Sequence, residues 1–189
     1  AWWGEGLAAA SSSSGLGNGL DGVFMVDVGT GATALVGQGI PGANFVTVTP
    51  WGTLIVSDPR VDELQELTAD GTVTTWLPDL LSPNGTAFTA DRSALWSVTT
   101  YADPQPVWRI PVVDGVAGTP VEVAAFGAGD VSDGVAVGAS GALYVVQNIG
   151  GRIDRVSQDG SVELVAEGVP WGASIAFGEG EGFDPCSLY

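Results

Sequence analysis

Three features of the sequence predict an all-β fold. The chain of 189 residues contains 29 Gly and 11 Pro, and its apolar runs are short and rich in Val, Thr and Ala, which is typical of strands joined by turns. No segment of ten or more residues shows a sustained helical period. A pattern of four short strands also recurs at intervals near 40 residues. This period predicts a β-propeller built from four-stranded antiparallel blades.

The repeat is clearest at residues 132–168, where turn residues separate four apolar runs. First strands of successive repeats start 40, 49 and 40 residues apart, at Asn44, Asn84, Asp133 and Ala173. One position of the second strand is always Leu, at Leu54, Leu95, Leu143 and Leu188. The turn between the third and fourth strands always contains Gly, at Gly31, Gly71, Gly115 and Gly160. These shared columns indicate one repeated structural unit.

Taken in order, residues 1–21 predict a partial strand at Trp2 and Trp3 and then a flexible Ser/Gly-rich loop. The rest of this single domain divides into a half-blade at 22–36, full blades at 43–78, 84–127 and 132–168, and a half-blade at 173–189. Two arrangements are open. The half-blades pair and close a four-bladed ring, or the chain is part of a longer propeller. The end of the chain inside a predicted strand favours the second arrangement.

The charge balance limits the classes of partner. The chain has 22 acidic residues against five Arg, no Lys and no His, which gives a formal charge of −17. This charge repels nucleic acid and anionic membrane surfaces, so we expect neither as a partner. The acidic side chains either attract cations or simply keep the protein soluble. The high acidity favours a secreted or periplasmic protein over a cytoplasmic one, and the sequence makes no prediction of oligomeric state.

Some catalytic chemistry is excluded by composition. Without His, the chain has no Ser-His-Asp or Cys-His nucleophile and no His-based zinc site, and its single Cys, Cys186, cannot form an intrachain disulfide. No stretch of 18 uninterrupted apolar residues is present, so no helix is expected to span a membrane.

The first-strand column suggests a site. First strands of propeller blades line the central channel, so Asn44, Asn84 and Asp133 are expected near one of its mouths. Their amide and carboxylate oxygens suit a hard cation such as Ca²⁺. The alternative is that Asn84-Gly85 and Asp133-Gly134 are ordinary turn dipeptides whose Gly supplies a positive φ.

Two further groups of side chains are interpreted by position. Trp171 lies close to the predicted channel mouth and is a candidate for stacking on a ligand. Four acidic residues follow a second strand and are expected to face water: Asp58, Asp62, Glu63 and Glu66.

Several short motifs resemble the SMP-30/gluconolactonase/luciferin-regenerating family. They are Pro83-Asn84-Gly85, Ser132-Asp133-Gly134, the run from Gly141 to Val146, the run from Gly150 to Val156, and Ala176-Phe177-Gly178 before Ser187. The resemblance covers about residues 22–189 and corresponds to the latter two-thirds of such a chain. It implies part of a six-bladed propeller with a divalent metal at the channel mouth, usually Ca²⁺ but also Zn²⁺, Mn²⁺ or Mg²⁺. It also implies hydrolysis of a sugar lactone or related ester.

Residue by residue, the resemblance implies that Asn84 and Asp133 are metal ligands. It also implies that Asp133 is the base that activates water, and that Asn44 contacts substrate or water on the metal. A further Glu ligand is expected upstream of the matched residues. The rival hypothesis is a non-catalytic, NHL-like propeller that serves as a binding scaffold. Lyase chemistry of the virginiamycin-inactivating type is disfavoured because it is expected to use a His.

Overall fold

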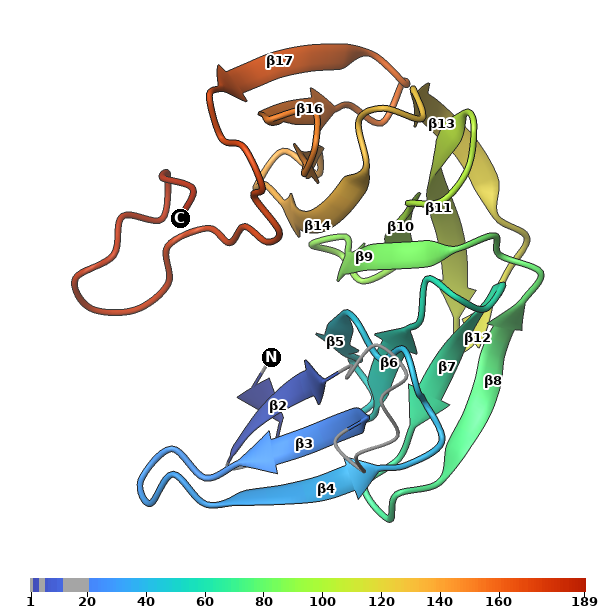
Figure 1. Cartoon of the computed structure of the whole chain (residues 1–189), viewed down its shortest axis with the longest axis vertical. Coiled ribbons are helices and arrows are strands. Elements are labelled where there is room, and N and C mark those ends of the chain that lie inside the picture. Colours follow the sequence, from blue (N-terminus) through green and yellow to red (C-terminus); the bar gives the residue numbers. More distant parts are fainter. Residues whose placement is uncertain (1, 4–5, 12–20) are drawn as a thin grey trace. The chain divides into compact units, whose positions relative to one another are not determined.

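The computed structural model describes residues 2–3, 6–11 and 21–189, and the regular elements in these ranges are all β-strands (Figure 1). They form four antiparallel sheets, each made of strands that are consecutive in the chain. This confirms the predicted fold class, a β-propeller with four-stranded antiparallel blades. Within the same ranges, no helix is long and apolar enough to cross a membrane.

The chain divides into two compact units. The first comprises Ala1–Asn84 and Val113–Ala117, and the second comprises Gly85–Val112 and Gly118–Tyr189. The strands of the first sheet are β1 (Trp2–Trp3), β2 (Gly6–Ser11), β3 (Gly22–Val26) and β4 (Thr33–Gly37). Those of the second sheet are β5 (Val46–Val48), β6 (Leu54–Ser57), β7 (Glu63–Leu67) and β8 (Val73–Pro78).

The third sheet has five strands, because two strands that follow β11 in the chain, the short β12 and the longer β13, both pair with it. Its strands are β9 (Pro83–Phe88), β10 (Ala94–Thr99), β11 (Gln105–Val113), β12 (Val116–Ala117) and β13 (Val121–Phe126). The fourth sheet consists of β14 (Ser132–Val137), β15 (Leu143–Gln147), β16 (Arg152–Val156) and β17 (Val162–Glu167). The predicted full blades therefore agree with the observed sheets to within three residues at each end.

Each unit has its own apolar core. In the first unit the core consists of Ala8, Val23, Ile40, Ala43, Leu54, Val56 and Leu67. In the second it consists of Trp96, Val98, Val107, Phe126, Val135, Leu143, Val145 and Val156. All of these residues lie in strands except Ile40 and Ala43, which lie between β4 and β5. Each core draws on both sheets of its unit, so burial of apolar side chains between neighbouring blades stabilises each unit.

The first sheet has one strand more than the prediction, which gives two strands at 22–36 and a partial strand at Trp2 and Trp3. The partial strand is present as β1, and the structure adds β2, which pairs with β3 from Leu7 to Ser11. The run from Gly6 to Ser11 lacks β-branched and aromatic residues, so its composition does not predict a strand. Backbone pairing and burial of Ala8 in the core hold it in place. Most of the predicted flexible loop, at residues 12–20, lies outside the described residues.

The structure also tests closure by the chain ends. Leu188 forms a single bridge with Phe177, supported by backbone hydrogen bonds between Ala176 and Tyr189, so residues 173–189 form a minimal hairpin rather than two strands. β3 already has β2 on one side and β4 on the other. Both edges of β3 are therefore occupied by strands of its own sheet.

Candidate functional site

The first-strand positions from which the sequence predicts a site share a backbone feature. Two residues before Asn84, Asp133 and Ala173, the backbone is left-handed, at Ser82 (φ 41°), Val131 (φ 58°) and Trp171 (φ 62°). This conformation costs a non-Gly residue about 1–2 kcal/mol, and it is especially unusual for β-branched or bulky side chains. Such strain often occurs at functional sites. Its recurrence at one position of three repeats indicates that the column residues are structurally equivalent.

Gly85 and Gly134 follow two of these column residues and lie inside strands β9 and β14, without a positive φ. A Cβ added to Gly134 would lie 2.5 Å from the carbonyl oxygen of Ala173, and one added to Gly85 would collide with the carbonyl oxygen of Asp133. Glycine is therefore required because the backbone at the next position of the column, Asp133 or Ala173, passes so close. The interpretation of Asn84-Gly85 and Asp133-Gly134 as turn dipeptides is wrong.

A β-bulge sets the position of Asp133. β14 pairs with β15 through Ser132 and Gln147 and again through Val135 and Val145, with a shift of register between them. Asp133 and Gly134 together face one residue of β15, which is the arrangement of a bulge. Bulges re-aim side chains at sheet ends, and here the half-buried Asp133 is the side chain affected.

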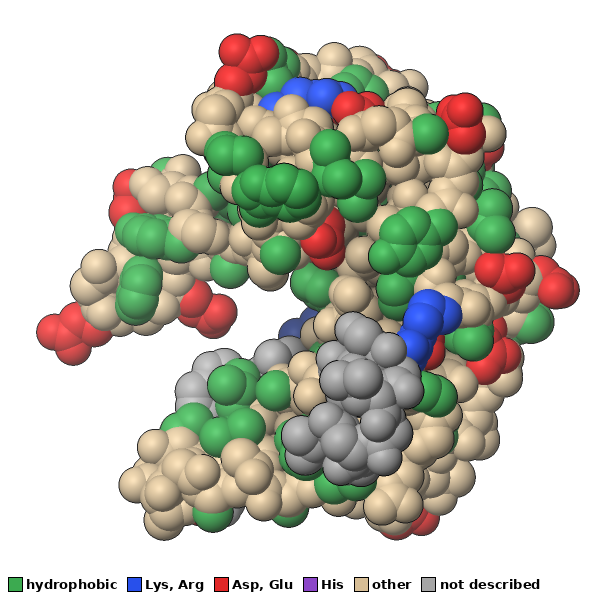
Figure 2. All heavy atoms as spheres, in the orientation of Figure 1, with side chains coloured by type: hydrophobic (Ala, Val, Ile, Leu, Met, Phe, Trp, Pro, Cys, Tyr) green, Lys and Arg blue, Asp and Glu red, His purple; other side chains and the backbone are tan. Residues whose placement is uncertain are grey.

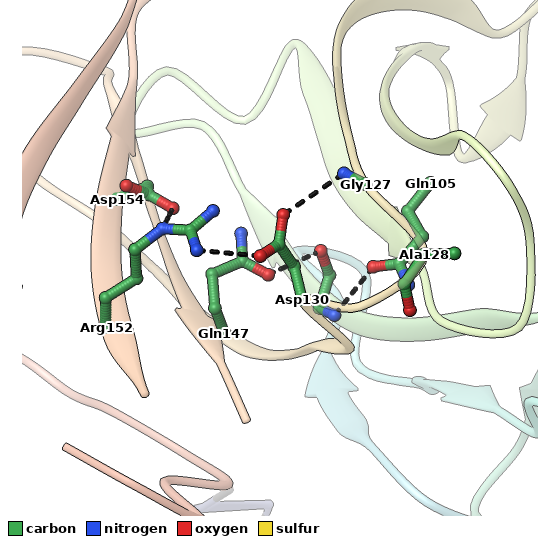
Figure 3. Close-up of polar contacts among 8 residues, drawn as sticks. Gln105, Gly127, Ala128, Asp130, Gln147, Arg152 and Asp154 are labelled. Carbon is green, nitrogen blue, oxygen red and sulfur yellow. Dashed lines mark hydrogen bonds and ion pairs between the residues drawn. The ribbon is translucent and has the colours of Figure 1, made fainter. Parts of the chain in front are cut away.

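Buried polar side chains fix the backbone beneath this bulge (Figure 3). The Ser132 hydroxyl donates to Oε1 of Gln147 (3.0 Å), and the Ser132 N–H donates to Oε1 of Gln105 (2.9 Å). The Thr100 hydroxyl donates to the carbonyl oxygen of Ser132 (2.6 Å). Ser132, Gln105 and Gln147 are almost fully buried. Hydrogen bonds of this kind are costly to break, because the remaining partners would stay buried and unsatisfied.

An ion-pair cluster holds the segment that leads into β14 (Figure 3). Arg152 lies between two carboxylates, with Nη1 2.7 Å from Oδ1 of Asp130 and Nε 2.8 Å from Oδ2 of Asp154. Asp130 also accepts a hydrogen bond from the Gly127 N–H (3.1 Å). The hydrogen bond from Arg152 holds the pKa of Asp130 below its ordinary value, so this carboxylate stays ionised at neutral pH.

Asn148 is a site residue that the sequence reasoning missed. Its Nδ2 donates to Oδ2 of Asp133 (3.2 Å) and to the carbonyl oxygen of Gly172 (3.0 Å). The backbone carbonyl oxygen of Asn148 accepts a hydrogen bond from the backbone N–H of Trp171 (2.9 Å). Asn148 therefore connects the predicted catalytic carboxylate to the segment that carries Trp171. It stands outside the repeat columns, and its only sequence signal is its place just before the turn at Gly150 and Gly151.

Trp171 presents its ring to solvent. Its side chain is 74% exposed although its backbone is left-handed. A hydrophobic residue that is both strained and exposed gains little from packing, which favours a role in ligand contact. The structure therefore brings Asp133 and the Trp171 segment together in the second unit.

Asn44 lies in the first unit and is exposed on the loop before β5. Its N–H donates to the carbonyl oxygen of Ser57 (2.9 Å). Asp58 steadies the same loop, because its Oδ2 accepts a hydrogen bond from the Gly42 N–H (2.7 Å) and its Oδ1 lies 3.3 Å from Nε of Arg60. Asp58 is only 2% exposed, so the expectation that it faces water is wrong. A buried acidic group paired in this way gives no signal in the sequence.

Asn84 is 4% exposed at the start of β9 and belongs to the first unit. The convergence of Asn44, Asn84 and Asp133 on one point stays a prediction.

The donor chemistry fits a hard cation. Asn84 offers an amide oxygen and Asp133 a carboxylate, and Ca²⁺ takes both kinds of ligand together with waters. Among the described residues, no group of three or more His, Cys, Asp and Glu side chains can hold a metal ion, and Figure 2 shows acidic side chains dispersed over the visible face. A metal at this site would therefore depend on amide oxygens as well as on Asp133.

Comparisons with known proteins agree with the family resemblance seen in the sequence. Residues 23–184 match the SMP-30/Gluconolactonase/LRE-like region family. A 6-deoxy-6-sulfogluconolactonase from Pseudomonas putida is 30% identical over 152 residues, which are 75% of this chain and 50% of that protein. The chain thus spans half the length of this relative.

Solved structures show the same fold. The calcium-binding protein regucalcin from Agrobacterium tumefaciens is 24% identical with a TM-score of 0.68, over 87% of this chain and 58% of that one. A gluconolactonase from Xanthomonas campestris is 18% identical with a TM-score of 0.67, over 82% of this chain and 58% of that one. At these identities the likeness shows the β-propeller fold alone.

Proposed function

Because the chain belongs to the SMP-30/gluconolactonase/LRE-like family, we propose that it hydrolyses a sugar lactone or a related ester with a divalent cation as cofactor. The observation that carries this proposal is the equivalence of Asn84 and Asp133, since both follow a left-handed residue by two positions and precede a Gly inside a strand. An amide and a carboxylate at one position of successive repeats are the donors that such a cation needs.

Each predicted site residue has a role in this hydrolysis. Asn84 and Asp133 would hold the cation, which supplies Lewis acidity that polarises the lactone carbonyl. Asp133 takes a proton from the attacking water and returns it to the ring oxygen as the acyl C–O bond breaks, giving a hydroxy acid. Asn44 orients the substrate, and Trp171 offers an aromatic face to the sugar ring. Attack by water needs no covalent nucleophile, which agrees with the absence of His.

The direct test is turnover of sugar lactones with added Ca²⁺, Zn²⁺, Mn²⁺ or Mg²⁺, after subtraction of spontaneous hydrolysis. We expect cation-dependent turnover of at least one lactone. A thermal shift with Ca²⁺ but no turnover on any lactone would instead support the non-catalytic scaffold.

We expect Trp171→Gly to raise KM for the lactone about threefold or more while leaving the free energy of unfolding unchanged or higher. Removal of the exposed ring loses stacking, whereas Gly relieves a left-handed backbone that costs about 1–2 kcal/mol. Steady-state kinetics and thermal unfolding measure the two effects separately. A fall in stability without a change in KM would show that the ring packs rather than binds.

Asn148→Ala is expected to lower kcat/KM about tenfold, because outer partners of metal ligands typically contribute 10–100-fold to affinity or activity. The carboxylate of Asp133 would keep its charge but lose one of the contacts that orient it. Ser161→Ala, which removes an exposed hydrogen bond to Asp159 in the same unit, is the control and should leave kcat/KM unchanged. Equal kcat/KM in Asn148→Ala and wild type would exclude this positioning role.

A further inference from the structure

A polar cavity of about 210 Å³ lies in the second unit, away from the candidate hydrolytic site. The turns that follow β9 and β14 line it, together with β11 and the turn after β16; the polar residues are Thr89, Asp91, Arg109, Ser140 and Gln158. Asp133 lies at the start of β14, whereas Ser140 lies beyond its end. The cavity and the candidate hydrolytic site are therefore at opposite ends of this strand. Its volume is small for a ligand pocket, so only a small molecule would fit.

Arg109 is the unusual residue of this cavity. Three of the chain's five Arg residues, Arg60, Arg152 and Arg155, form ion pairs. Arg109 is half-buried on β11, and in the part of the chain that the structure describes its side chain forms neither an ion pair nor a hydrogen bond; its buried Nε has no acceptor. A buried donor without an acceptor is costly. The net charge of −17 opposes anion binding at long range. Only a local positive charge can attract the anionic group of a small ligand here, and the guanidinium of Arg109, which lines the cavity without an ion pair to any described residue, supplies it.

Asp91 shares the cavity but does not pair with Arg109. Its Oδ1 accepts hydrogen bonds from the Thr89 hydroxyl (2.6 Å) and from the N–H and hydroxyl of Ser93 (3.1 and 2.9 Å). The hydrogen bond from the Thr89 hydroxyl is the main reason that the pKa of Asp91 is lowered to about 2, and the nearby charge of Arg109 also lowers it. Asp91 is thus an ionised acceptor held by its own turn, and it would repel a simple oxyanion but accept a hydroxyl group.

We propose that this cavity binds a small polyhydroxy carboxylate, such as a sugar acid. The ligand's carboxylate would accept hydrogen bonds from the guanidinium of Arg109, a group suited to paired hydrogen bonds with carboxylates. Its hydroxyl groups would donate to Asp91 and contact the exposed Ser140 and Gln158. A ligand that combines a negative charge with hydroxyl groups matches a cavity that places a cation and an acceptor side by side. The proposal rests on this cavity alone and does not require the chain to be a hydrolase.

The test is titration of the full chain with gluconate, followed by calorimetry and by NMR shifts of the Ser140 and Gly141 amides. We expect gluconate to bind at least tenfold more tightly than acetate, phosphate or sorbitol, which lack either the hydroxyl groups or the carboxylate. The Asp133→Asn variant should keep this binding, which separates the cavity from the hydrolytic site. Equal binding of phosphate, or shifts confined to residues near Asp133, would overturn the proposal.

Arg109→Gln should weaken gluconate binding at least tenfold. Arg92→Gln is the matched control, since it removes the same charge from an exposed turn residue next to Asp91 and should change the affinity less than twofold. If Arg109→Gln does not fold, Ser140→Ala removes one exposed hydroxyl instead and should weaken binding about threefold. Equal losses in Arg92→Gln and Arg109→Gln, or no loss in Ser140→Ala, would contradict the assignment.

Discussion

Asp133→Asn is expected to reduce kcat/KM for lactone hydrolysis by a factor of 100 or more while the fold is retained. The substitution keeps the size of the side chain, and its amide oxygen can still accept the hydrogen bond from Asn148. It removes the negative charge that would hold a cation and the basicity that would take a proton from water. A positioned general base alone typically contributes 10²–10⁴-fold.

The measurement is initial-rate kinetics with saturating Ca²⁺, alongside thermal unfolding of both proteins. Asp159→Asn is the matched control, because it removes the same charge from an exposed turn of the same unit. Its kcat/KM should equal that of the wild type. Equal rates in Asp133→Asn and wild type would remove Asp133 from the mechanism.

Gly134→Ala is expected to destabilise the protein by about 2–3 kcal/mol, the range typical of overpacking. The new methyl group would lie 2.5 Å from the carbonyl oxygen of Ala173 and 2.6 Å from Cα of Ser174, and both are backbone atoms that cannot rotate away. Relief would require separation of β14 from the segment at 173–174. We also expect lower activity, since Asp133 precedes this contact.

Chemical and thermal unfolding measure this cost. For a chain of this size it corresponds to a fall in Tm of roughly 4–12 °C. Gly129→Ala is the control, because a Cβ at Gly129 has no neighbour within 4 Å and the backbone there is not left-handed; it should be neutral or slightly stabilising. If the two variants unfold alike, β14 and the segment at 173–174 do not lie as close together as the structure shows.

The strand repeat could be predicted because it leaves columns in the sequence. The four turn glycines all have positive φ, at Gly31, Gly71, Gly115 and Gly160. The second-strand residues Leu54, Leu95 and Leu143 are fully buried. Turn geometry and burial each demand a particular residue type, so both are visible in a single sequence.

Other features depend on contacts that leave no such pattern. β2 consists of Gly, Leu, Ala and Ser, and pairing with β3 rather than strand propensity explains it. Asp58 is buried because a backbone N–H and Arg60 satisfy its carboxylate. Asn148 joins Asp133 to Gly172 from a position outside the repeat. Tertiary partners decide the roles of these residues, and sequence spacing does not reveal them.

The most direct test of the account is Ca²⁺ affinity measured by calorimetry for wild type, Asn84→Ala, Asp133→Asn and the double variant. If both side chains hold one ion, each single variant should bind Ca²⁺ at least tenfold more weakly than the wild type. The Ca²⁺ affinity of the double variant should then be only slightly lower than that of the weaker-binding single variant, because the effects of coupled residues are not additive. Losses that simply add, or an affinity for Ca²⁺ that neither substitution changes, would contradict a shared site.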